Sequence, residues 1–397
     1  MSRPLLILFL MIFFIGTDTF LLSPLLPTLQ QQFQVPKEIS GWMVGAYALG
    51  YALFALVVGP ISDRLNRKSV MIVGFLAFAI STALCGLATG FASMIVFRLL
   101  AGISAAIVSP QIWAAIPFLV PQERIIKAMG IVTAGLSVAQ LLGVPLGSLV
   151  GTLDWSVPFY LVGGLSVLLL FFIHKWIPTM PAQTGAHQLS IVARYRQILF
   201  MSSSKQAFLG YFLFQIGNFS AFTFIGTFLA DYFSLSLAGI GGVMILLGTG
   251  NLVGSLTGGY IVQQLGRFRT FVLSVGMLVV VYLTLPLSAH LLTVQGLFFL
   301  AFFSGGLLFP IMMSGLQAID PASRGTIASL SNSIMYAGTT VGSALAGILY
   351  AKFSGFHSIS LFTAACFFFS LLLFVKSGIL ASSSLSPIPT KAKSGSV

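Results

Sequence analysis

Charged side chains are scarce in this chain of 397 residues, because Asp, Glu, Lys and Arg together make up only 7% of it. A soluble domain carries roughly 25% charged residues, so the composition excludes a soluble globular protein. In lipid, only helices and closed barrels pair every backbone polar group internally, and a barrel would show alternating segments of about ten residues. The apolar stretches here run for about twenty residues, enough to cross a ~30 Å hydrocarbon core at ~1.5 Å per residue. The sequence therefore predicts an all-α membrane protein.

The chain also lacks the residue patterns of an enzyme. The sequence has no cluster of metal ligands, no paired nucleophile and base, and no phosphate-binding loop, so we expect no enzyme, no cofactor and no metal. The missing nucleotide motif also excludes a self-contained ATP-driven pump. Cys85 and Cys366 fall inside apolar stretches and are interpreted as buried thiols rather than a disulfide. The net charge of +12 does not indicate a nucleic-acid partner, because the basic residues lie in short loops.

Twelve apolar stretches are long enough to cross a membrane. The first is a full-length span with no small-residue cleavage site after it, so it is not a cleavable signal. The predicted spans are 4–26, 41–62, 69–91, 93–117, 129–151, 156–176, 207–230, 237–262, 270–289, 293–317, 326–350 and 358–378. They form two bundles of six helices, 1–176 and 207–378, joined by a polar cytoplasmic linker, 177–206. The tail 379–397 is rich in Ser, Pro and Lys and is predicted to be disordered.

Lysine and arginine are distributed unevenly between the two sides of the predicted bundle. If the N-terminus is cytoplasmic, 16 of the 19 basic residues lie on the inner side, Lys37 and Lys352 lie on the outer side, and Arg98 lies inside a span. An excess of basic residues in short loops marks the cytoplasmic side. We therefore predict a multi-pass protein of a bacterial cell membrane with both termini in the cytoplasm.

The two halves of the sequence match when one is shifted by 200 residues. The matches fall at equivalent loops and helix positions without a gap, and include Gly41 with Gly241, Gly50 with Gly250, Arg67 with Arg267, Pro110 with Pro310, and Arg124 with Arg324. Six helices per half give both halves the same orientation, so the repeat is parallel about an axis along the membrane normal. This symmetry is typical of transporters whose halves enclose a central site and rock around it.

The loop after the second predicted span reads Gly59-Pro-Ile-Ser-Asp63-Arg64-Leu-Asn66-Arg67-Lys68. It resembles the Gly-x-Leu-x-Asp-Arg-x-Gly-Arg-Arg/Lys signature of the major facilitator superfamily. Asn66 replaces the usual glycine, and Asn also tolerates the left-handed conformation. The resemblance covers residues 4–378 and implies twelve helices in two pseudo-symmetric six-helix bundles. It also implies a gating loop in which Asp63 latches the outward-facing state against the N-terminus of the eleventh helix. The gating residues are Gly59, Asp63, Arg64, Arg67 and Lys68.

The fifth predicted span contains Gly135-Leu-Ser-Val-Ala-Gln140-Leu-Leu-Gly143-Val-Pro145-Leu-Gly147. This run resembles the antiporter signature of the drug/proton antiporter branch of the superfamily. A valine separates Gly143 from Pro145, as in a subgroup of sugar, purine and drug exporters. The resemblance implies export, with Gly143, Pro145 and Gly147 as the antiporter motif. The small residues also favour close helix packing and the proline favours a kink, so ordinary packing stands beside the functional interpretation.

Asp18 and Arg98 are the charged residues that lie well inside predicted spans. A charge in hydrocarbon costs at least ~2.5–3.5 kcal/mol, so such residues usually find partners and serve function. At ~1.5 Å per residue, Asp18 lies roughly 21 Å from the inner end of its span and Arg98 lies roughly 8 Å from the outer end of its own span. In a hydrocarbon core ~30 Å thick these two depths coincide. Arg98-Leu-Leu-Ala-Gly102 resembles a family motif associated with proton coupling, and Gly16-Thr-Asp18 resembles the start of many antiporters. We predict that Asp18 carries the coupled proton and Arg98 tunes it; the alternative is a static salt bridge.

These charges are missing from the second half of the repeat. The positions equivalent to Asp18 and Arg98 hold Asn218 and Phe298, and the position equivalent to Asp63 also lacks its acid. The coupling chemistry is therefore predicted to belong to the N-terminal half, which leaves the C-terminal half mainly to bind substrate.

Polar and aromatic residues within the predicted cavity helices are the candidates for substrate binding. They are Tyr47, Tyr51, Gln140, Gln215, Asn218, Phe222, Asn251, Asn332 and Tyr336. A mostly apolar pocket with a few amides and phenols suits a lipophilic or neutral aromatic compound. We predict a monomeric, proton-coupled exporter of small amphiphilic or neutral molecules, of the drug-exporting type. An exporter of a defined metabolite, such as a sugar, nucleobase or amino acid, and a proton-coupled uptake symporter are the alternatives.

Overall fold

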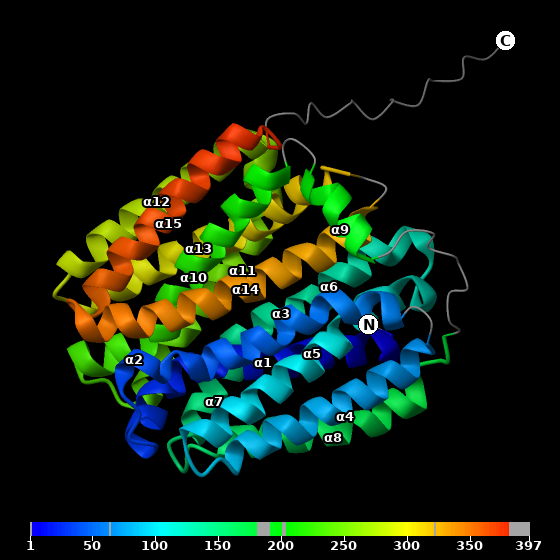
Figure 1. Ribbon diagram of the computed structural model, residues 1–397, viewed down its shortest axis with the longest axis horizontal. Helices are drawn as coiled ribbons and strands as arrows, with labels where there is room; N and C mark the ends of the chain where they lie inside the picture. The colour runs from blue at the N-terminus through cyan, green and yellow to red at the C-terminus, as the bar shows by residue number, and fades with distance from the viewer. Residues whose placement is uncertain (1, 63–64, 181–190, 201–203, 321–322, 381–397) are drawn as a thin grey trace.

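The computed structural model describes residues 2–62, 65–180, 191–200, 204–320 and 323–380, and every regular element in these ranges is helical (Figure 1). In this part of the chain, twelve helical runs are long and apolar enough to cross a membrane. The first six are α1 (Arg3–Gln32), α2 (Lys37–Ser40) with α3 (Trp42–Ser62), α4 (Arg67–Gly86), α5 (Phe91–Leu119), η1 (Gln122–Arg124) with α6 (Ile125–Val138), the π-turn η2 (Ala139–Gly143) and α7 (Val144–Val150), and α8 (Val157–Trp176). The other six are α10 (Ser204–Phe233), α11 (Leu237–Leu265), α12 (Arg267–Thr284) with η3 (Leu285–Leu287), α13 (Leu291–Gln317), α14 (Arg324–Lys352) and α15 (Phe356–Ser377). The predicted twelve-helix, all-α membrane fold is confirmed.

Several predicted span ends differ from the helix ends, and the ends of the first and third spans are two examples. The first predicted span stops at residue 26, but α1 continues to Gln32 with two prolines inside it. Hydropathy marks only the stretch that is apolar enough for lipid. The helix α1 continues beyond it, because Leu29 and Gln30 are buried and Gln30 Nε2 donates a hydrogen bond to Ser40 Oγ at 2.8 Å. Conversely, α4 ends at Gly86, before the predicted end of the third span at residue 91.

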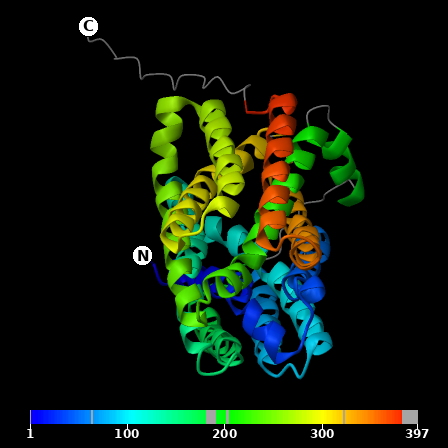
Figure 2. The same cartoon turned by 90° about the vertical axis from the view of Figure 1, so that its left-hand side faces the viewer.

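Each half of the chain forms its own bundle of six spans. In the N-terminal half α5 packs on α3 and α4, and in the C-terminal half α10 packs on α14 and α15 while α11 packs on α13. Figure 2 shows the blue-to-teal N-terminal half below the green-to-red C-terminal half. The 200-residue repeat is also present in the packing. A Cβ on Gly50 would lie 2.4 Å from Leu99 O, and a Cβ on Gly250 would lie 2.6 Å from Phe299 O. Both helix crossings are therefore close enough to require glycine.

The helices run between two faces of the molecule. The start of α1 lies at one face, here called the terminal face, and α2 lies at the other, here called the opposite face (Figure 1). The stretch that joins the halves contains α9 (Ile191–Phe200), in which Tyr195 Oη donates to Leu56 O at 3.4 Å. Ile379 and Leu380 are buried, so the folded chain extends past the predicted boundary at residue 378.

The two halves meet where α3 packs on α14, α1 packs on α10, and η2 with α7 packs on α11. At the opposite face, a Cβ on Gly41 would lie 1.9 Å from Ser343 O. Nearer the middle of the same helix pair, Ser333 Oγ donates to Ala52 O at 2.6 Å. The contact between α3 and α14 thus extends from the opposite face to mid-depth, so the halves are closed at that face.

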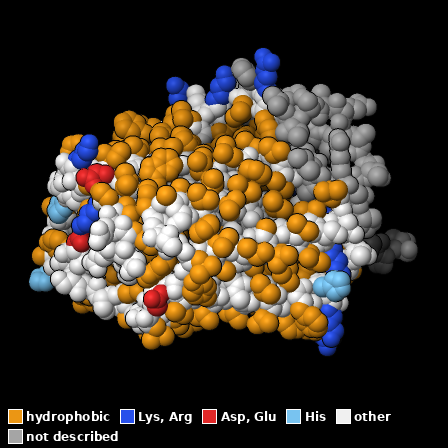
Figure 3. Space-filling view, turned by 60° about the horizontal axis from the view of Figure 1, so that its bottom comes forward, with side chains coloured by type: hydrophobic (Ala, Val, Ile, Leu, Met, Phe, Trp, Pro, Cys, Tyr) orange, Lys and Arg blue, Asp and Glu red, His pale blue; other side chains and the backbone are white. Residues whose placement is uncertain are grey.

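Hydrophobic side chains cover the surface between the two faces. Figure 3 shows them across the middle of one side of the molecule, with charged side chains mainly at its margins. Leu256 is 74% exposed, and Leu168 and Val73 are also largely exposed. A continuous apolar surface of this kind suits contact with lipid, where helices satisfy their own backbone groups. The chain is a multi-pass membrane protein.

Candidate substrate and coupling sites

A small pocket lies between the two halves at the centre of the molecule. Its walls come from α1, η2, α7, α10, α11 and α13, and its lining residues are Phe20, Gln140, Val144, Phe222, Met244, Leu247, Gly248 and Phe302. The open space is about 10 Å³, which holds about one water molecule. A substrate of ordinary size therefore needs the halves to move apart.

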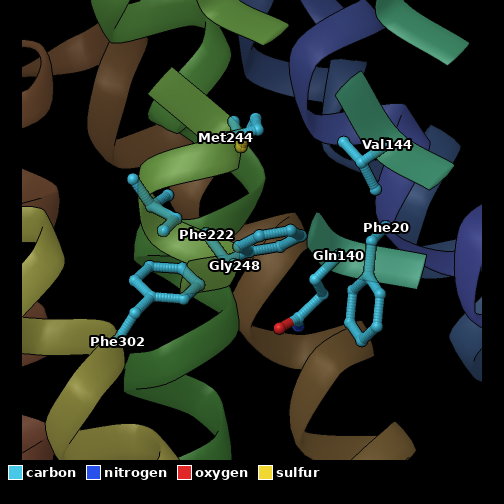
Figure 4. A pocket seen from close by; sticks show the side chains of 8 residues that line it. Phe20, Gln140, Val144, Phe222, Met244, Gly248 and Phe302 are labelled. Carbon is cyan, nitrogen blue, oxygen red and sulfur yellow. The ribbon is translucent and has the colours of Figure 1, made fainter. Parts of the chain in front are cut away.

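Gln140 is the polar side chain of this pocket, and three phenylalanine rings surround it. The rings of Phe20 and Phe222 pack edge to face with centroids 5.6 Å apart, and those of Phe222 and Phe302 lie 6.1 Å apart. Figure 4 shows the Gln140 amide extending into the space between Phe20 and Phe302. Among the described residues, Gln140 Oε1 is buried and accepts no hydrogen bond. A buried acceptor normally has a partner, so this oxygen is available to a ligand that donates a hydrogen bond.

The π-turn η2 explains how Gln140 reaches the pocket. The Val144 N–H donates to Ala139 O, five residues back, instead of making the four-residue bond of an α-helix. Pro145 follows directly and has no N–H of its own, so the regular ladder cannot continue across this point. Single π-turns inside helices occur frequently at functional sites.

The glycines of the same run hold this turn against α1. A Cβ on Gly143 would lie 2.1 Å from Thr17 Oγ1, and a Cβ on Gly147 would lie 2.5 Å from Leu21 Cδ1. The motif therefore packs closely, as the structural interpretation predicted. Its proline also coincides with the turn that presents Gln140, so the two interpretations do not exclude one another.

Asp18 and Arg98 form a buried ion pair inside the N-terminal half. Arg98 Nη1 donates to Asp18 Oδ2 at 2.8 Å, and the two side chains are 0% and 1% exposed. Arg98 Nε also donates to Met43 O at 3.4 Å. The pairing that their matching depths predicted is present. Neither residue lines the central pocket, however, because their helices turn them toward the interior of the N-terminal bundle.

Tyr47 lies between this ion pair and the other half. The Arg98 guanidinium carbon lies 4.4 Å from the centroid of the Tyr47 ring, a cation–π contact. Tyr47 Oη and Thr19 Oγ1 are 3.1 Å apart. On the other side, the rings of Tyr47 and Tyr336 are 6.4 Å apart, and Tyr336 stacks on Tyr51 at 3.7 Å. Three predicted substrate residues therefore form one aromatic cluster across the contact between α3 and α14.

The remaining predicted substrate residues are more scattered. Phe222 lines the central pocket with Gln140, but Gln215, Asn218, Asn251 and Asn332 do not. Gln215 is buried within the C-terminal half, where a Cβ on Gly338 would lie 2.8 Å from its own Cβ. The three asparagines are only half-buried.

Sequence reasoning missed most of the apolar wall of the pocket. It selected mainly polar side chains, whereas Phe20, Met244, Leu247 and Gly248 supply much of the lining. Phe20 lies two residues after Asp18, which is about 200° around a helix of ~3.6 residues per turn. The two side chains therefore face opposite sides of α1, and this spacing is the signal in the sequence that α1 also reaches the pocket.

The gating loop is described only in part. Asp63 and Arg64 lie outside the described residues, as does the side-chain environment of Gly59. Arg67 is buried, with its guanidinium carbon 6.0 Å from the centroid of the Phe118 ring. Lys68 Nζ donates to His174 O at 2.7 Å.

Asn66 corrects one expectation about this loop. Its φ of −65° is not left-handed, so tolerance of that conformation is not why Asn replaces glycine here. Instead, Asn66 Oδ1 accepts a hydrogen bond from the Lys68 N–H at 3.0 Å and caps the N-terminus of α4. Asn is among the best residues for this capping position.

The fold and the pocket between its halves define a membrane transporter. The model of the Major Facilitator Superfamily matches residues 8–338 and 207–394, and the chain belongs to this family. The family consists of transporters rather than enzymes, which confirms both the predicted family and the prediction of no enzyme activity. As a member of it, the chain transports small molecules through a membrane.

Two curated relatives illustrate the range of similarity. The chain is 48% identical over 366 residues, 92% of this chain and 94% of the relative, to a Bacillus subtilis protein called the uncharacterized MFS-type transporter YceJ. It is 26% identical over 264 residues, 64% of each chain, to a Helicobacter pylori protein called a probable sugar efflux transporter.

Solved structures are similar in fold. A bacterial homologue of the human lysosomal transporter Spinster, in an inward-facing and unoccupied conformation, matches with a TM-score of 0.77 and 17% identity over 98% of this chain and 99% of the other. The human organic anion transporter MFSD10 matches with a TM-score of 0.73 and 19% identity over 94% and 99%.

Proposed function

We propose that the protein is a proton-coupled exporter of small neutral or amphiphilic molecules that works by alternating access. The observation that carries the proposal is the buried ion pair of Asp18 and Arg98 beside Tyr47. This pair lies in the half that the antiporter-like run also occupies, and it is separate from the central pocket. In this proposal the proton binds at the ion pair and the substrate binds in the central pocket, and movement of the halves couples the two.

The ion pair gives a physical route to coupling. When Asp18 takes up a proton, Arg98 loses the negative charge that compensates its own, and an uncompensated buried charge is strongly unfavourable. Protonation therefore favours a state in which the surroundings of Arg98 have changed. Tyr47 covers Arg98 and neighbours Tyr336 on α14, so a movement of α14 relative to α3 would alter the access of protons to Asp18.

The central pocket is the proposed substrate site. Three phenylalanine rings and the Gln140 amide suit a neutral aromatic compound with a hydrogen-bond donor, because apolar walls supply contact area and one polar group fixes orientation. The closed pocket would enlarge as the halves part around it.

The distribution of Lys and Arg supports cytoplasmic termini, so the opposite face is proposed to be extracellular. Closure at that face then excludes an outward-facing state. We assign the two moving units to 1–176 and 207–378, with 177–206 as the linker and 379–397 as a cytoplasmic tail, in a monomer. In this scheme the loop containing Asp63 stabilises the outward-facing state.

The test begins with a substrate. Drug-sensitivity profiles of a deletion strain and an overexpressing strain identify a transported compound, and purified protein in proteoliposomes is then given an imposed pH gradient. We expect the wild type to concentrate the compound and Asp18→Asn to exchange it only downhill. Asp154→Asn is the control, because Asp154 is exposed in the loop between α7 and α8. Concentrative transport by Asp18→Asn would exclude coupling through this residue.

Export of a defined metabolite is the second candidate. It is favoured by the unpartnered oxygen of Gln140, since one fixed hydrogen bond selects for a specific partner, and by the similarity to a probable sugar efflux transporter. Unchanged drug sensitivity in both strains, together with counterflow of a labelled sugar in proteoliposomes, would favour this candidate. Counterflow under the pH gradient also distinguishes export from uptake by a proton symporter.

A further inference from the structure

We propose that the opposite face carries a binding site for organic ammonium cations in the C-terminal half, and that the Lys37 ammonium group of the N-terminal half takes the place of the ligand's cationic group beside Asp231 while the halves are closed there. The site is separate from the central pocket. It combines a carboxylate, several aromatic rings and a cavity that opens at the surface.

The cavity has a volume of about 260 Å³ and lies where α10 ends and α15 begins. Two of its rings, Phe228 and Phe356, are buried and stack with centroids 4.4 Å apart. The Tyr232 ring stacks on Phe228 at 5.7 Å and is 53% exposed, so it forms the outer wall. Asp231 and Tyr350 also line the cavity. Aromatic faces beside a carboxylate attract cations through both charge and the ring quadrupole.

Asp231 and Tyr350 are held together within the C-terminal half. Tyr350 Oη donates to Asp231 Oδ2 at 2.7 Å, which fixes the carboxylate beside the ring. The Tyr350 ring in turn stacks on Phe224 at 5.2 Å. These residues belong to α10 and α14 of one half, so the carboxylate and its aromatic surroundings stay assembled when the halves separate.

The cation that meets this site comes from the other half. Lys37 Nζ forms an ion pair with Asp231 Oδ2, and it lies 5.1 Å from the centroid of the Tyr350 ring. Lys37 belongs to α2, whose backbone packs on α14: a Cβ on Gly347 would lie 2.7 Å from Lys37 O. The ammonium group of Lys37 therefore has the two interactions, carboxylate and aromatic face, that a bound organic cation would have.

Separation of the halves at this face would remove Lys37 and leave the site without its cation. This step rests on the alternating access of the proposed function. An amine or quaternary ammonium compound can then take the place of Lys37, and it would compete with closure. A simple ion-pair lock makes a different prediction, because it needs only the two opposite charges and gives the aromatic rings no part in ligand binding.

The test measures binding of radiolabelled benzyltrimethylammonium to the full chain in lipid nanodiscs. Lys37→Ala removes the competing side chain, and we expect the dissociation constant to fall about threefold to tenfold, given the modest strength of an exposed ion pair and a cation–π contact. Lys352→Ala is the matched control, since Lys352 is exposed near the end of α14, and its binding should equal that of the wild type.

In the Lys37→Ala background, Asp231→Asn and Tyr350→Leu should each raise the dissociation constant at least about tenfold, because each removes one of the two interactions with the cation. Asp154→Asn should have no effect. Each variant is first shown to be monodisperse by size-exclusion chromatography. The proposal is overturned if Lys37→Ala binds no tighter than the wild type, or if either Asp231→Asn or Tyr350→Leu binds like its Lys37→Ala parent.

This measurement does not depend on proton coupling. The binding variants Lys37→Ala, Asp231→Asn and Tyr350→Leu all keep the buried pair of Asp18 and Arg98, so the cation site is tested without changing the proposed coupling residues. Loss of coupled transport in Asp18→Asn, together with the expected changes of cation binding in these variants, supports both proposals. Intact transport coupling in Asp18→Asn would overturn the proposed function and leave the cation site standing.

Discussion

Removing the negative charge of Asp18 should destabilise the N-terminal half strongly. Asp18→Asn keeps the size of the side chain but leaves Arg98, which is 0% exposed, without its charged partner. Breaking a buried ion pair in this way costs about 3–5 kcal/mol. For a unit of roughly two hundred residues this corresponds to a fall in melting temperature of about 6–20 °C.

The protein carries its own reporters for this measurement. Cys85 in α4 and Cys366 in α15 are both buried, so a thiol-reactive dye labels each one only as its half unfolds. Cys366→Ala leaves Cys85 to report on the N-terminal half, and Cys85→Ala leaves Cys366 to report on the C-terminal half. We expect Asp18→Asn to lower the Cys85 transition by more than the Cys366 transition.

A second variant separates charge from packing. In Asp18→Asn combined with Arg98→Gln neither of the two sites carries a charge, and a double-mutant cycle isolates the interaction between them. We expect the double variant to recover most of the stability that Asp18→Asn loses. If Asp18→Asn melts with the wild type, or if the double variant melts no higher than Asp18→Asn, the argument from an uncompensated buried charge is refuted.

Three further predictions concern the contact between α3 and α14, the π-turn η2 and the N-terminal cap of α4. Gly41→Ala should lower the melting temperature by several degrees, because its Cβ would lie 1.9 Å from a backbone oxygen of α14. Gly242→Ala is the control and should not lower it, because a Cβ there meets nothing within 4 Å. Equal melting temperatures of the two variants would contradict the close contact. Pro145→Ala restores an N–H next to the π-turn, so the Gln140 side chain should shift. The apparent affinity for a transported compound, measured in proteoliposomes, should then fall about threefold or more. An unchanged affinity would show that the turn has no part in substrate binding. Asn66→Ala removes the cap of α4 and should destabilise the N-terminal half by about 1 kcal/mol, whereas Asn66→Asp should retain the cap. Thermal unfolding monitored through the Cys85 thiol in α4 compares the two variants with the wild type. Equal stability of the wild type and both variants would exclude the capping role.

The two halves match in scaffold but differ in charge, and the surroundings of Arg98 and its repeat equivalent Phe298 show this difference. Arg98 is buried beside Tyr47 in the N-terminal half, whereas its repeat equivalent, Phe298, is buried among the aromatic rings of the C-terminal half, 6.4 Å from Phe228 and 6.3 Å from Phe356. The same scaffold position thus contributes to an ion pair in one half and to an aromatic cluster in the other.

The depth of each residue along the membrane normal was predictable from the sequence. Hydropathy locates the spans because backbone groups in lipid must be satisfied within a helix, and the rise per residue then converts position into depth. This is why the pairing of Asp18 with Arg98 could be predicted. The 200-residue offset likewise located equivalent crossings, such as those at Gly50 and Gly250.

The rotation of each helix about its own axis was not predictable in the same way. The spans are apolar on all sides, so periodicity does not show which side faces lipid, a neighbouring helix or the cavity. Polar composition therefore selected Gln215 and Asn251 as pocket residues, although neither lines it, and passed over Phe20. The sequence placed Lys37 in a short loop on the side with few basic residues, but it did not show the contact of Lys37 with Asp231, which is 194 residues away in the sequence.

The sequence by itself therefore determined the number of spans, the repeat and the depth of the buried charges, because lipid imposes these through local and additive rules. Tertiary structure alone decided three features: the aromatic rings of α1, α10 and α13 that Gln140 meets, the place of Tyr47 between the ion pair and the other half, and the contact of Lys37 with Asp231. Each of these depends on how two or more helices pack against one another, and no single span encodes that information.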